Sequence, residues 1–332
     1  MKNKFKVCII GCGVIFRNHI VSLLALDNVE ISALCDIKAE KAERMRNEYA
    51  LDCPVYSDYI KMLDEINPDA VHILTPHYLH TQMTLDALER NINVFLEKPI
   101  CIKEDDIQKL IDAESKSKAR VCVSFQTRYN KAVKIAKQII DEDGGAIYGS
   151  GAVIWNRSDE YYASGDWRGK CATEGGGVLI NQAIHTIDLL HFFLGIPKKV
   201  QAICSKMRHG ESVEVEDTCQ CIIDFDNGKR ANLLATTTYC GHDSTTLRIE
   251  SKNHVVEIRD QWLYVDGELI ETEKSESYIG KKCYGNSHMI AIESFYTALS
   301  EGSDMQIPLS DAQYAVKIIL AAYKSNSQII EL

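Results

Sequence analysis

Two short segments carry side chains that could move a proton to or from an alcohol. Lys98 stands in a Glu97-Lys98-Pro99 triplet, and His185 follows Asn181 by four residues, on one face of an expected helix. An imidazole titrates near neutral pH, and a partly desolvated lysine can do the same, which suits proton exchange with a hydroxyl group. Each residue alone also has a structural explanation: a surface lysine before a helix-starting proline, or a core histidine on an apolar helix.

The surroundings of these segments add to the chemical interpretation. The triplet comes directly after an expected strand, at the sheet edge where open α/β folds bind ligands, and Pro99 could adopt a cis bond that directs the lysine. Three glycines, Gly175 to Gly177, precede the helix with His185 and would let another backbone or a ligand come close.

A glycine-rich turn near the N-terminus could hold a dinucleotide. Gly11 and Gly13 follow a strand and open a helix, where free N–H groups favour a pyrophosphate, although Phe16 stands where a third small residue is usual. Asp36 ends the next strand and could accept hydrogen bonds from ribose hydroxyls, which favours NAD over NADP, while Lys38 leaves NADP open. A turn without a ligand and an Asp that caps a helix are the alternatives.

The elements that must position these residues change character along the chain. Short apolar runs over 6–11, 29–36, 69–76, 93–99 and 120–125 alternate with helical patterns over 14–26, 38–50, 78–91 and 103–118. Strands buried on both faces and separated by helices indicate βαβ units and a doubly wound parallel sheet.

The second part of the sequence predicts a different α/β domain with a large open, mainly antiparallel sheet. Helices are expected over 131–141 and 178–193, a strand over 146–157, and two closing helices over 287–300 and 311–325. Several strand-like stretches between residues 199 and 265 are separated by turn signals such as Asp226-Asn227-Gly228 and Asp266-Gly267, which are typical of hairpins. We therefore expect domains at 1–125 and 126–332, with a cleft between them.

Composition narrows the class of protein. A net charge of -10 disfavours nucleic acid and anionic membrane surfaces as partners, and no uncharged stretch is long enough to cross a bilayer. The basic and apolar N-terminus lacks a small-residue cleavage site, so we expect a first strand there. Twelve cysteines, from Cys8 to Cys283, lack disulfide-scaffold and zinc-ligand spacing, which predicts reduced thiols, a cytoplasmic location and no metal.

The order and spacing of these segments resemble those of a known family. The turn GCGVIF, Asp36, Thr75-Pro76 with His80, the Glu97-Lys98-Pro99 triplet and GGGVLINQAIHTIDLL are similar to the glucose-fructose oxidoreductase and inositol dehydrogenase family, Gfo/Idh/MocA. The resemblance covers essentially the whole chain. It implies a Rossmann domain, an α/β domain whose open sheet often serves oligomerisation, and a nicotinamide held in the cleft.

The resemblance also implies roles for individual residues. Lys98 would be the catalytic lysine, and His185 would exchange the hydroxyl proton. Asn181 stands where inositol dehydrogenase-like members carry an Asp, and an amide cannot share charge with imidazolium, so the base role could move toward Lys98. The implied cofactor-binding residues are Gly11, Gly13, Val14, Ile15, Asp36, Thr75, Pro76, His77, His80, Glu97, Lys98, Gln126, Trp167 and Arg168.

A substrate site is expected from residues of both domains. Arg157, Arg168 and Tyr161 could meet a carboxylate or phosphate, or could instead pair with local acids such as Asp159 and Glu160 or with Asp166. The segments around Arg157 and Arg168, with the Asn-Gln-x-x-His pattern, resemble the UDP-N-acetylglucosaminuronate 3-dehydrogenase branch. The expected substrate-binding residues are Lys98, Arg128, Tyr129, Arg157, Tyr161, Asn181 and His185.

These observations together predict an NAD-dependent oxidoreductase acting on a secondary alcohol of a sugar, cyclitol or nucleotide sugar. Lys98 and His185 would handle the hydroxyl proton, and the resemblance implies a homo-oligomer, a dimer or tetramer. Two other classes stay open: a nicotinamide-binding sensor or scaffold without turnover, and an NAD-assisted glycosidase or lyase on the same fold.

Overall fold

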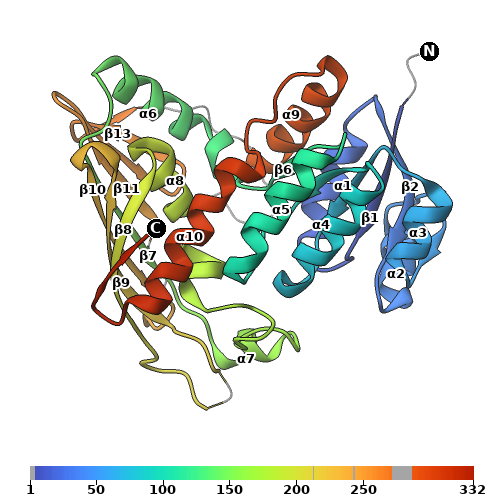
Figure 1. Cartoon of the computed structure of the whole chain (residues 1–332), viewed down its shortest axis with the longest axis horizontal. Coiled ribbons are helices and arrows are strands. Elements are labelled where there is room, and N and C mark those ends of the chain that lie inside the picture. The colour runs from blue at the N-terminus through green and yellow to red at the C-terminus, as the bar shows by residue number, and fades with distance from the viewer. Residues whose placement is uncertain (1–3, 212, 242–243, 271–285) are drawn as a thin grey trace. The chain divides into compact units, whose positions relative to one another are not determined.

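The chain divides into two compact units in the computed structural model, which describes residues 4–211, 213–241, 244–270 and 286–332. The first unit contains Met1–Cys101, Asp105–Phe125 and His288–Asp311. The second contains Ile102–Glu104, Gln126–Ser287 and Ala312–Leu332. Each unit has a sheet of its own (Figure 1).

The first unit is built on a six-stranded parallel sheet of order β3-β2-β1-β4-β5-β6. Its strands are β1 (Phe5–Ile10), β2 (Val29–Cys35), β3 (Val55–Tyr56), β4 (Ala70–Ile73), β5 (Asn93–Leu96) and β6 (Val121–Val123). Its helices are α1 (Phe16–Leu24), α2 (Ala39–Glu48), α3 (Tyr59–Ile66), α4 (His80–Glu89), α5 (Glu104–Lys116) and α9 (Ser287–Glu301). The strand order runs outward in both directions from β1 and β4, so the predicted doubly wound sheet is confirmed.

Helix α9 comes late in the chain and completes the core of this unit. The ring of Phe295 lies 5.5 Å from that of Phe95 on β5, and the ring of Tyr296 lies 5.5 Å from that of Phe5 on β1. All four residues of β4 are buried, as the continuous apolar run predicts for a central strand. The core of the Rossmann-like unit therefore depends on residues from both ends of the sequence.

The second unit is built on a nine-stranded sheet of order β14-β13-β12-β11-β7-β10-β9-β8-β15. Its strands are β7 (Tyr148–Ile154), β8 (Pro197–Ser205), β9 (Thr218–Phe225), β10 (Arg230–Thr236), β11 (Thr246–Glu250), β12 (Val255–Arg259), β13 (Trp262–Val265), β14 (Glu268–Ile270) and β15 (Ile329–Glu331). Its helices are α6 (Lys131–Glu142), α7 (Asp159–Ala163), α8 (Ile184–Leu194) and α10 (Leu309–Ser325). All strand pairs are antiparallel except β7 with β10, which confirms the predicted sheet type.

Helix α8 packs closely on one face of this sheet because β7 carries two glycines there. A Cβ at Gly151 would lie 2.5 Å from the methyl group of Thr186, and one at Gly149 would lie 2.9 Å from Leu194. Burial alternates along β7 and β10, so one face is covered and the other is more exposed. The close packing fixes the helix that carries His185.

The predicted hairpin turns have the expected backbone. Asp266 and Gly267 have φ of 50° and 89°, and Asn227 and Gly228 have φ of 59° and 74°. Positive φ at both central residues matches the twist of the flanking strands, which explains these residue types.

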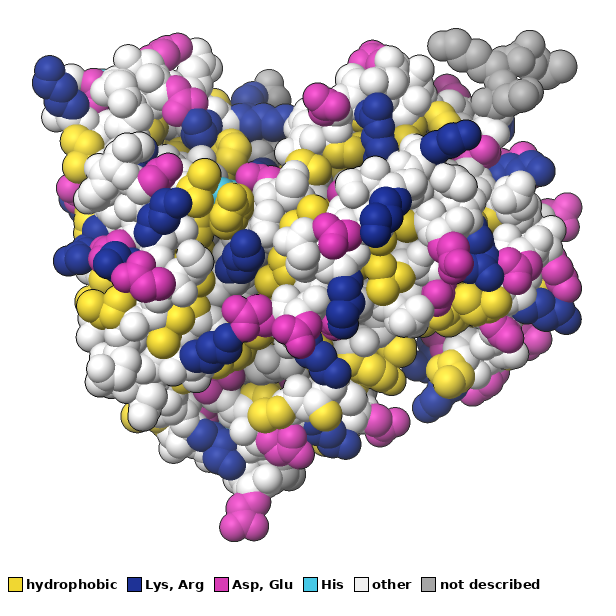
Figure 2. All heavy atoms as spheres, viewed as in Figure 1, with side chains coloured by type: hydrophobic (Ala, Val, Ile, Leu, Met, Phe, Trp, Pro, Cys, Tyr) yellow, Lys and Arg dark blue, Asp and Glu magenta, His cyan; other side chains and the backbone are white. Residues whose placement is uncertain are grey.

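Surface charge and cysteine chemistry can be read from the described residues. Basic and acidic side chains are interspersed on the face shown in Figure 2. Eleven cysteines are free thiols, and Cys283 lies outside the described residues. None of the described helices has the length and apolarity needed to cross a membrane.

Candidate active site

The glycine turn between β1 and α1 contains two glycines with different reasons for being glycine. Gly11 has φ of +98°, and a Cβ there would lie 2.7 Å from the carbonyl oxygen of Leu74, so the chain itself requires glycine. A Cβ at Gly13 would have no described heavy atom within 4 Å. Val14 beside it is exposed, and Phe16 is fully buried against Tyr49. The turn therefore leaves open space at Gly13, where a ligand could approach the backbone.

The Asp36 carboxylate lies beside this turn. One oxygen accepts a hydrogen bond from the amide of Cys12 at 2.9 Å, and the other accepts from the amide of Lys38 at 2.9 Å. The helix that follows has Lys38 at its N-cap, so Asp36 does not cap it. Each carboxylate oxygen can accept further hydrogen bonds, and the side chain is partly exposed. Asp36 thus stabilises the glycine turn and could still bind ribose hydroxyls.

His80 connects the two loops that follow β4 and β5. Its Nδ1 lies 2.7 Å from the carbonyl oxygen of Pro99, and its Nε2 lies 2.9 Å from that of Thr75. Burial lowers the pKa of His80, and a neutral ring donates only one of these two hydrogen bonds at a time. Pro76 precedes a single 3₁₀ turn (His77–Leu79) in which His77 is buried. His80 therefore lies between the backbone of the two loops, next to Thr75 in one and Pro99 in the other.

Glu97 is buried at the end of β5, next to Lys98. Its Oε1 lies 3.0 Å from Nε2 of His19, and the Lys98–Pro99 peptide bond is cis, as the sequence suggested. Burial would raise the pKa of Glu97, but the hydrogen bond from His19 and the charges of His19, His288 and Lys98 outweigh burial. The pKa of Glu97 therefore lies well below its usual range, and the group is a carboxylate.

The segment with Asn181 and His185 begins differently from the expected single α-helix. Leu179–Ala183 form a π-helical turn, and α8 follows directly from Ile184. Such wide turns are rare and occur frequently at functional sites. Asn181 therefore lies on a widened turn and His185 in the first turn of α8.

The three glycines before this turn admit close neighbours, as predicted. A Cβ at Gly175 would lie 2.4 Å from the Ile102 side chain, and one at Gly176 would lie 2.0 Å from the Tyr323 hydroxyl. A Cβ at Gly177 would lie 1.8 Å from the carbonyl oxygen of Glu216. These three positions are glycine because neighbouring protein atoms lie where a side chain would be, and not because a ligand needs the space.

The carboxylate of Glu216 holds the start of the same segment. It accepts hydrogen bonds from the amides of Gly177 at 2.7 Å and Leu179 at 3.0 Å, and from the Tyr323 hydroxyl at 3.0 Å. Burial raises the pKa of Glu216 to about 7, although these hydrogen bonds oppose the shift. The sequence did not identify Glu216, because no local pattern links it to a helix 39 residues earlier.

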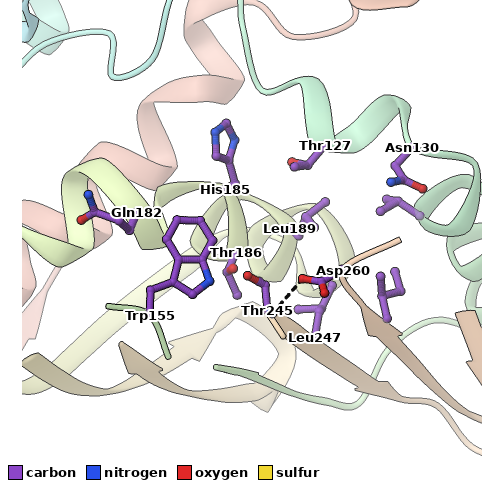
Figure 3. Close-up of a pocket in the computed structure, with 12 residues that line it drawn as sticks. Thr127, Asn130, Trp155, Gln182, His185, Thr186, Leu189, Thr245, Leu247 and Asp260 are labelled. Atoms are coloured by element: carbon purple, nitrogen blue, oxygen red, sulfur yellow. Dashed lines mark hydrogen bonds between the residues drawn. The ribbon is translucent and has the colours of Figure 1, made fainter. Parts of the chain in front are cut away.

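His185 borders a small cavity of about 50 Å³ in the second unit. Figure 3 shows its ring projecting from α8, with Gln182 on one side and Thr127 on the other. Its Nε2 lies 3.4 Å from the amide nitrogen of Gln126. A cavity of this size has room for water molecules beside the imidazole.

Arg128 and Tyr129, two expected substrate contacts, are buried. The guanidinium of Arg128 donates to both oxygens of Asp188, at 2.7 and 2.6 Å, and lies 4.9 Å from the centre of the Phe192 ring. The ammonium of Lys134 lies 5.5 Å from the centre of the Tyr129 ring. Arg128 thus anchors α8 through a buried ion pair, and its contact with substrate stays a prediction.

Arg157 and Arg168 stack on aromatic rings. Arg168 lies 4.5 Å from the centre of the Tyr161 ring and 4.6 Å from that of Trp167, and Arg157 lies 4.9 Å from the Tyr161 ring centre. Over the chain as described, no carboxylate forms an ion pair with either guanidinium, and Asp159 pairs with His209 instead. The alternative in which local acids neutralise these bases is therefore wrong.

Tyr161 brings several expected site residues together. Its hydroxyl accepts hydrogen bonds from Arg168 at 2.6 Å, from Asn181 at 3.2 Å and from Gln182 at 3.1 Å. The Asn181 amide nitrogen also donates to the carboxylate of buried Glu174. Sequence reasoning did not give Glu174 a role, although its place before the three glycines was a signal.

The expected residues thus form three groups. Gly11, Gly13 and Asp36 lie together in the first unit, as do Glu97, Lys98 and the His80 loops. In the second unit, Tyr161 connects Arg168 with Asn181, while Gln126 lies beside His185. Lys98 belongs to the first unit and His185 to the second, and their convergence on one hydroxyl group stays a prediction.

Comparisons with known proteins agree with this architecture. The chain is 31% identical to inositol 2-dehydrogenase of Salmonella paratyphi B over 57% of its own length, and the match spans about half, 54%, of that relative. It is 24% identical to D-glucoside 3-dehydrogenase of Escherichia coli over 97% of this chain and 95% of that protein. The crystal structure of the WlbA dehydrogenase from Bordetella pertussis in complex with NADH and UDP-GlcNAcA has a TM-score of 0.88 at 23% identity, covering 100% of this chain and 99% of that one.

Two family models match most of the chain. Residues 5–125 match the model described as oxidoreductase family, NAD-binding Rossmann fold. Residues 133–256 match the GFO/IDH/MocA C-terminal domain. The chain belongs to the Gfo/Idh/MocA oxidoreductase family.

Proposed function

We propose that the protein is an NAD-dependent dehydrogenase that oxidises, reversibly, a secondary alcohol of a sugar, cyclitol or nucleotide sugar. One observation carries this proposal. An NAD-binding Rossmann domain is joined to a second domain in which His185 and Asn181 lie on one helical segment, whose start is held by hydrogen bonds to Glu216. Relatives named as inositol and glucoside dehydrogenases support the class of substrate.

The first unit fits a dinucleotide. The open space at Gly13 leaves room for a pyrophosphate beside the start of α1, and Asp36 has lone pairs for the adenosine ribose. A carboxylate at that position would repel a 2'-phosphate, so NAD is the proposed cofactor. When bound, the nicotinamide supplies the carbon that accepts the hydride. The proposed contacts of the His77 and Trp167 segments with the cofactor follow from the family resemblance.

The protein's own residues would handle the hydroxyl proton. An amide nitrogen only donates hydrogen bonds, so the contact of Gln126 with His185 makes Nε2 of His185 the acceptor and leaves that atom able to take a proton. Asn181, whose amide nitrogen donates to Glu174 and Tyr161, would orient the hydroxyl without sharing charge. Lys98 is the proposed second proton-exchanging group.

The second unit favours a substrate that carries a carboxylate or phosphate. Arg157 and Arg168 are held by stacking on Tyr161, beside Asn181, and neither is neutralised by a described carboxylate. Preorganised guanidinium groups bind carboxylates and phosphates through charge-assisted hydrogen bonds. The neighbouring structure with UDP-GlcNAcA, an acidic nucleotide sugar, supports the same class.

A homo-oligomer formed through the exposed sheet face is also proposed. Ile203, Ile222 and Leu234 lie on neighbouring strands, on the face opposite α8, and are 57%, 38% and 36% exposed. Contiguous exposed apolar side chains on a sheet mark an interaction surface. Sedimentation velocity should show a dimer or tetramer, and Ile222→Glu should shift the population toward monomer. A wild-type protein that sediments as a monomer would refute this.

Turnover distinguishes the proposed activity from its rivals. NADH absorbance should rise when the protein and NAD meet a responsive member of a panel of acidic sugars, nucleotide sugars and cyclitols. NAD binding without turnover would indicate a sensor, and product formation without net NADH would indicate glycosidase or lyase chemistry. Lys98→Ala should lower turnover at least about 100-fold while keeping NAD affinity, whereas the exposed Lys109→Ala should not. Near-normal turnover of Lys98→Ala would remove Lys98 from the mechanism.

A further inference from the structure

A chain of four buried side chains crosses the first unit and ends at Glu97. The Tyr296 hydroxyl on α9 lies 2.9 Å from Nε2 of His72 on β4. Nδ1 of His72 lies 2.9 Å from Nδ1 of His19 on α1, and Nε2 of His19 lies 3.0 Å from Oε1 of Glu97. All four side chains are buried. The chain links residues from α1, β4 and the end of β5 to Tyr296 of α9, which lies 224 residues after His72.

The hydrogen bonds couple the proton positions along this chain. A carboxylate only accepts, so Nε2 of His19 must carry a hydrogen. The contact between the two Nδ1 atoms has one donor and one acceptor, as does the contact of Nε2 of His72 with the Tyr296 hydroxyl, so each hydrogen bond constrains the direction of the next. Burial lowers the pKa of His72 and raises that of Tyr296, which keeps the ring neutral and the phenol protonated. Every contact in the chain is then satisfied in one direction.

An ionised carboxylate at this depth needs positive charge nearby. His288 on α9 lies 3.9 Å from Oε1 of Glu97, but burial lowers its pKa to about 4, so it is neutral near pH 7. Lys98 directly follows Glu97 in the chain, so its ammonium is tethered near the buried carboxylate, and its charge is one of those that lower the pKa of Glu97 against the opposing effect of burial. Electrostatic coupling between two groups is mutual, so Glu97 acts on Lys98 as strongly as Lys98 acts on Glu97.

We propose that Tyr296, His72 and His19 hold Glu97 as an oriented carboxylate, and that this buried charge sets how readily Lys98 gives up its proton. Glu97 and the chain behind it are positioning residues, and they act on the substrate only through Lys98. The catalytic meaning of this inference rests on the proposed function, but the effect on Lys98 itself does not.

Several titratable groups face Glu97 and must be separated from Lys98 in any measurement. They are His19 from α1, His72 from β4, His80 from α4 and His288 from α9. A direct titration of the Lys98 side chain avoids their overlap. In protein labelled with ¹³C at lysine Cε, the Lys98 signal is assigned by its loss in Lys98→Arg.

The decisive comparison is wild type against Glu97→Gln, which keeps the shape and removes the charge. The Lys98 midpoint should fall by about 1 to 2 pH units, the usual effect of losing an adjacent opposite charge. Tyr296→Phe removes only the hydroxyl at the far end of the chain and should give a smaller fall. Glu43→Gln, on the exposed face of α2, should leave the midpoint unchanged. In the pH profile of kcat/KM, the limb that reports the titration of Lys98 should shift by the same amount as the Lys98 midpoint.

Three results would overturn the inference. An unchanged Lys98 midpoint in folded Glu97→Gln would show that the charge does not act on Lys98. An unchanged midpoint in Tyr296→Phe would remove the chain from the account. His19, Glu97 and His288 also bring potential ligand atoms within 4.8 Å of one another, so one equivalent of zinc in purified protein, lost in Glu97→Gln, would replace the hydrogen-bonded chain by a metal site. A normal turnover of Lys98→Ala beside a shifted midpoint would instead refute only the proposed catalytic role.

Discussion

Gly13→Ala separates a glycine needed by the fold from one needed by a ligand. A methyl group at Gly13 meets no described heavy atom within 4 Å, and its backbone does not need a positive φ. Gly11→Ala is the matched change two residues away, where the same methyl group would lie 2.7 Å from the carbonyl oxygen of Leu74 at φ of +98°. Any loss of function in Gly13→Ala must therefore come from something that binds there.

The structure gives the expected magnitudes. Gly13→Ala should raise the free energy of unfolding slightly, by about 0.4 to 1 kcal/mol, because alanine restricts the unfolded chain. Gly11→Ala should lower it by about 1 to 3 kcal/mol, since the backbone oxygen of Leu74 cannot move aside easily. A pyrophosphate seated against Gly13 would be displaced by the added methyl group, so NAD affinity should fall at least about tenfold, or about 1.4 kcal/mol.

Two measurements on ligand-free and NAD-loaded protein test these values. Chemical denaturation without NAD gives the two stabilities, and isothermal titration calorimetry gives the affinity of each folded variant. Wild-type NAD affinity in Gly13→Ala would show that the pyrophosphate does not approach this turn. A marked loss of stability in Gly13→Ala without NAD would show that the open space does not exist in solution.

Three further predictions concern the second unit. Gly177→Ala should lower the free energy of unfolding by at least about 2 kcal/mol, because its Cβ would lie 1.8 Å from the carbonyl oxygen of Glu216. Gly210→Ala is the control, because a Cβ there meets no described heavy atom within 4 Å. Equal denaturation midpoints for the two variants would contradict this prediction. Because burial raises the pKa of Glu216 from 4.5 to about 7, its contribution to stability is full below pH 4.5 and is lost as pH rises through 7, by up to about 3 kcal/mol. Glu216→Gln should remove that slope from a series of denaturation curves, and an unaltered slope would exclude Glu216 as its source. Asp188→Asn should lower the free energy of unfolding by about 3 to 5 kcal/mol, because it leaves the charge of Arg128 buried without a counter-charge. A loss below about 1 kcal/mol, which is typical of exposed ion pairs, would show that the pair is hydrated.

Periodicity was enough to predict most of the fold. Continuous apolar runs gave β1, β2, β4, β5 and β6, and alternating runs with Asn-Gly and Asp-Gly turns gave the strands from β8 to β13. The pieces missed were β3, α3, α7, β14 and β15, which are two to eight residues long and carry too few residues for a periodic signal. The assignment of 288–311 to the first unit could not be read locally, because it depends on rings that pack against strands formed far earlier in the chain.

The candidate site was predictable where chemistry and local spacing coincide. Gly11, Asp36 and the three glycines were found because each stands at a fixed place in a strand–turn or turn–helix pattern. Glu216, Tyr323 and the partners of Glu97 were not found, because their hydrogen bonds join residues separated by 37 or more positions. Sequence spacing also suggested that local acids neutralise Arg157 and Arg168, whereas stacking on aromatic rings decides their surroundings.

The two proposed proton-exchanging groups illustrate why the family's short motifs are not sufficient on their own. The helix with His185 has its place because Glu216 holds the start of the π-helical turn before it and Arg128 is paired with Asp188 within it. The loop with Lys98 has its charge environment because the adjacent buried carboxylate of Glu97 is held by a hydrogen bond from His19 of another element. Both supports are buried ionisable groups, which are costly unless each hydrogen bond is made. Their presence at both candidate groups is explained if proton affinity, and not only position, is what the fold must control.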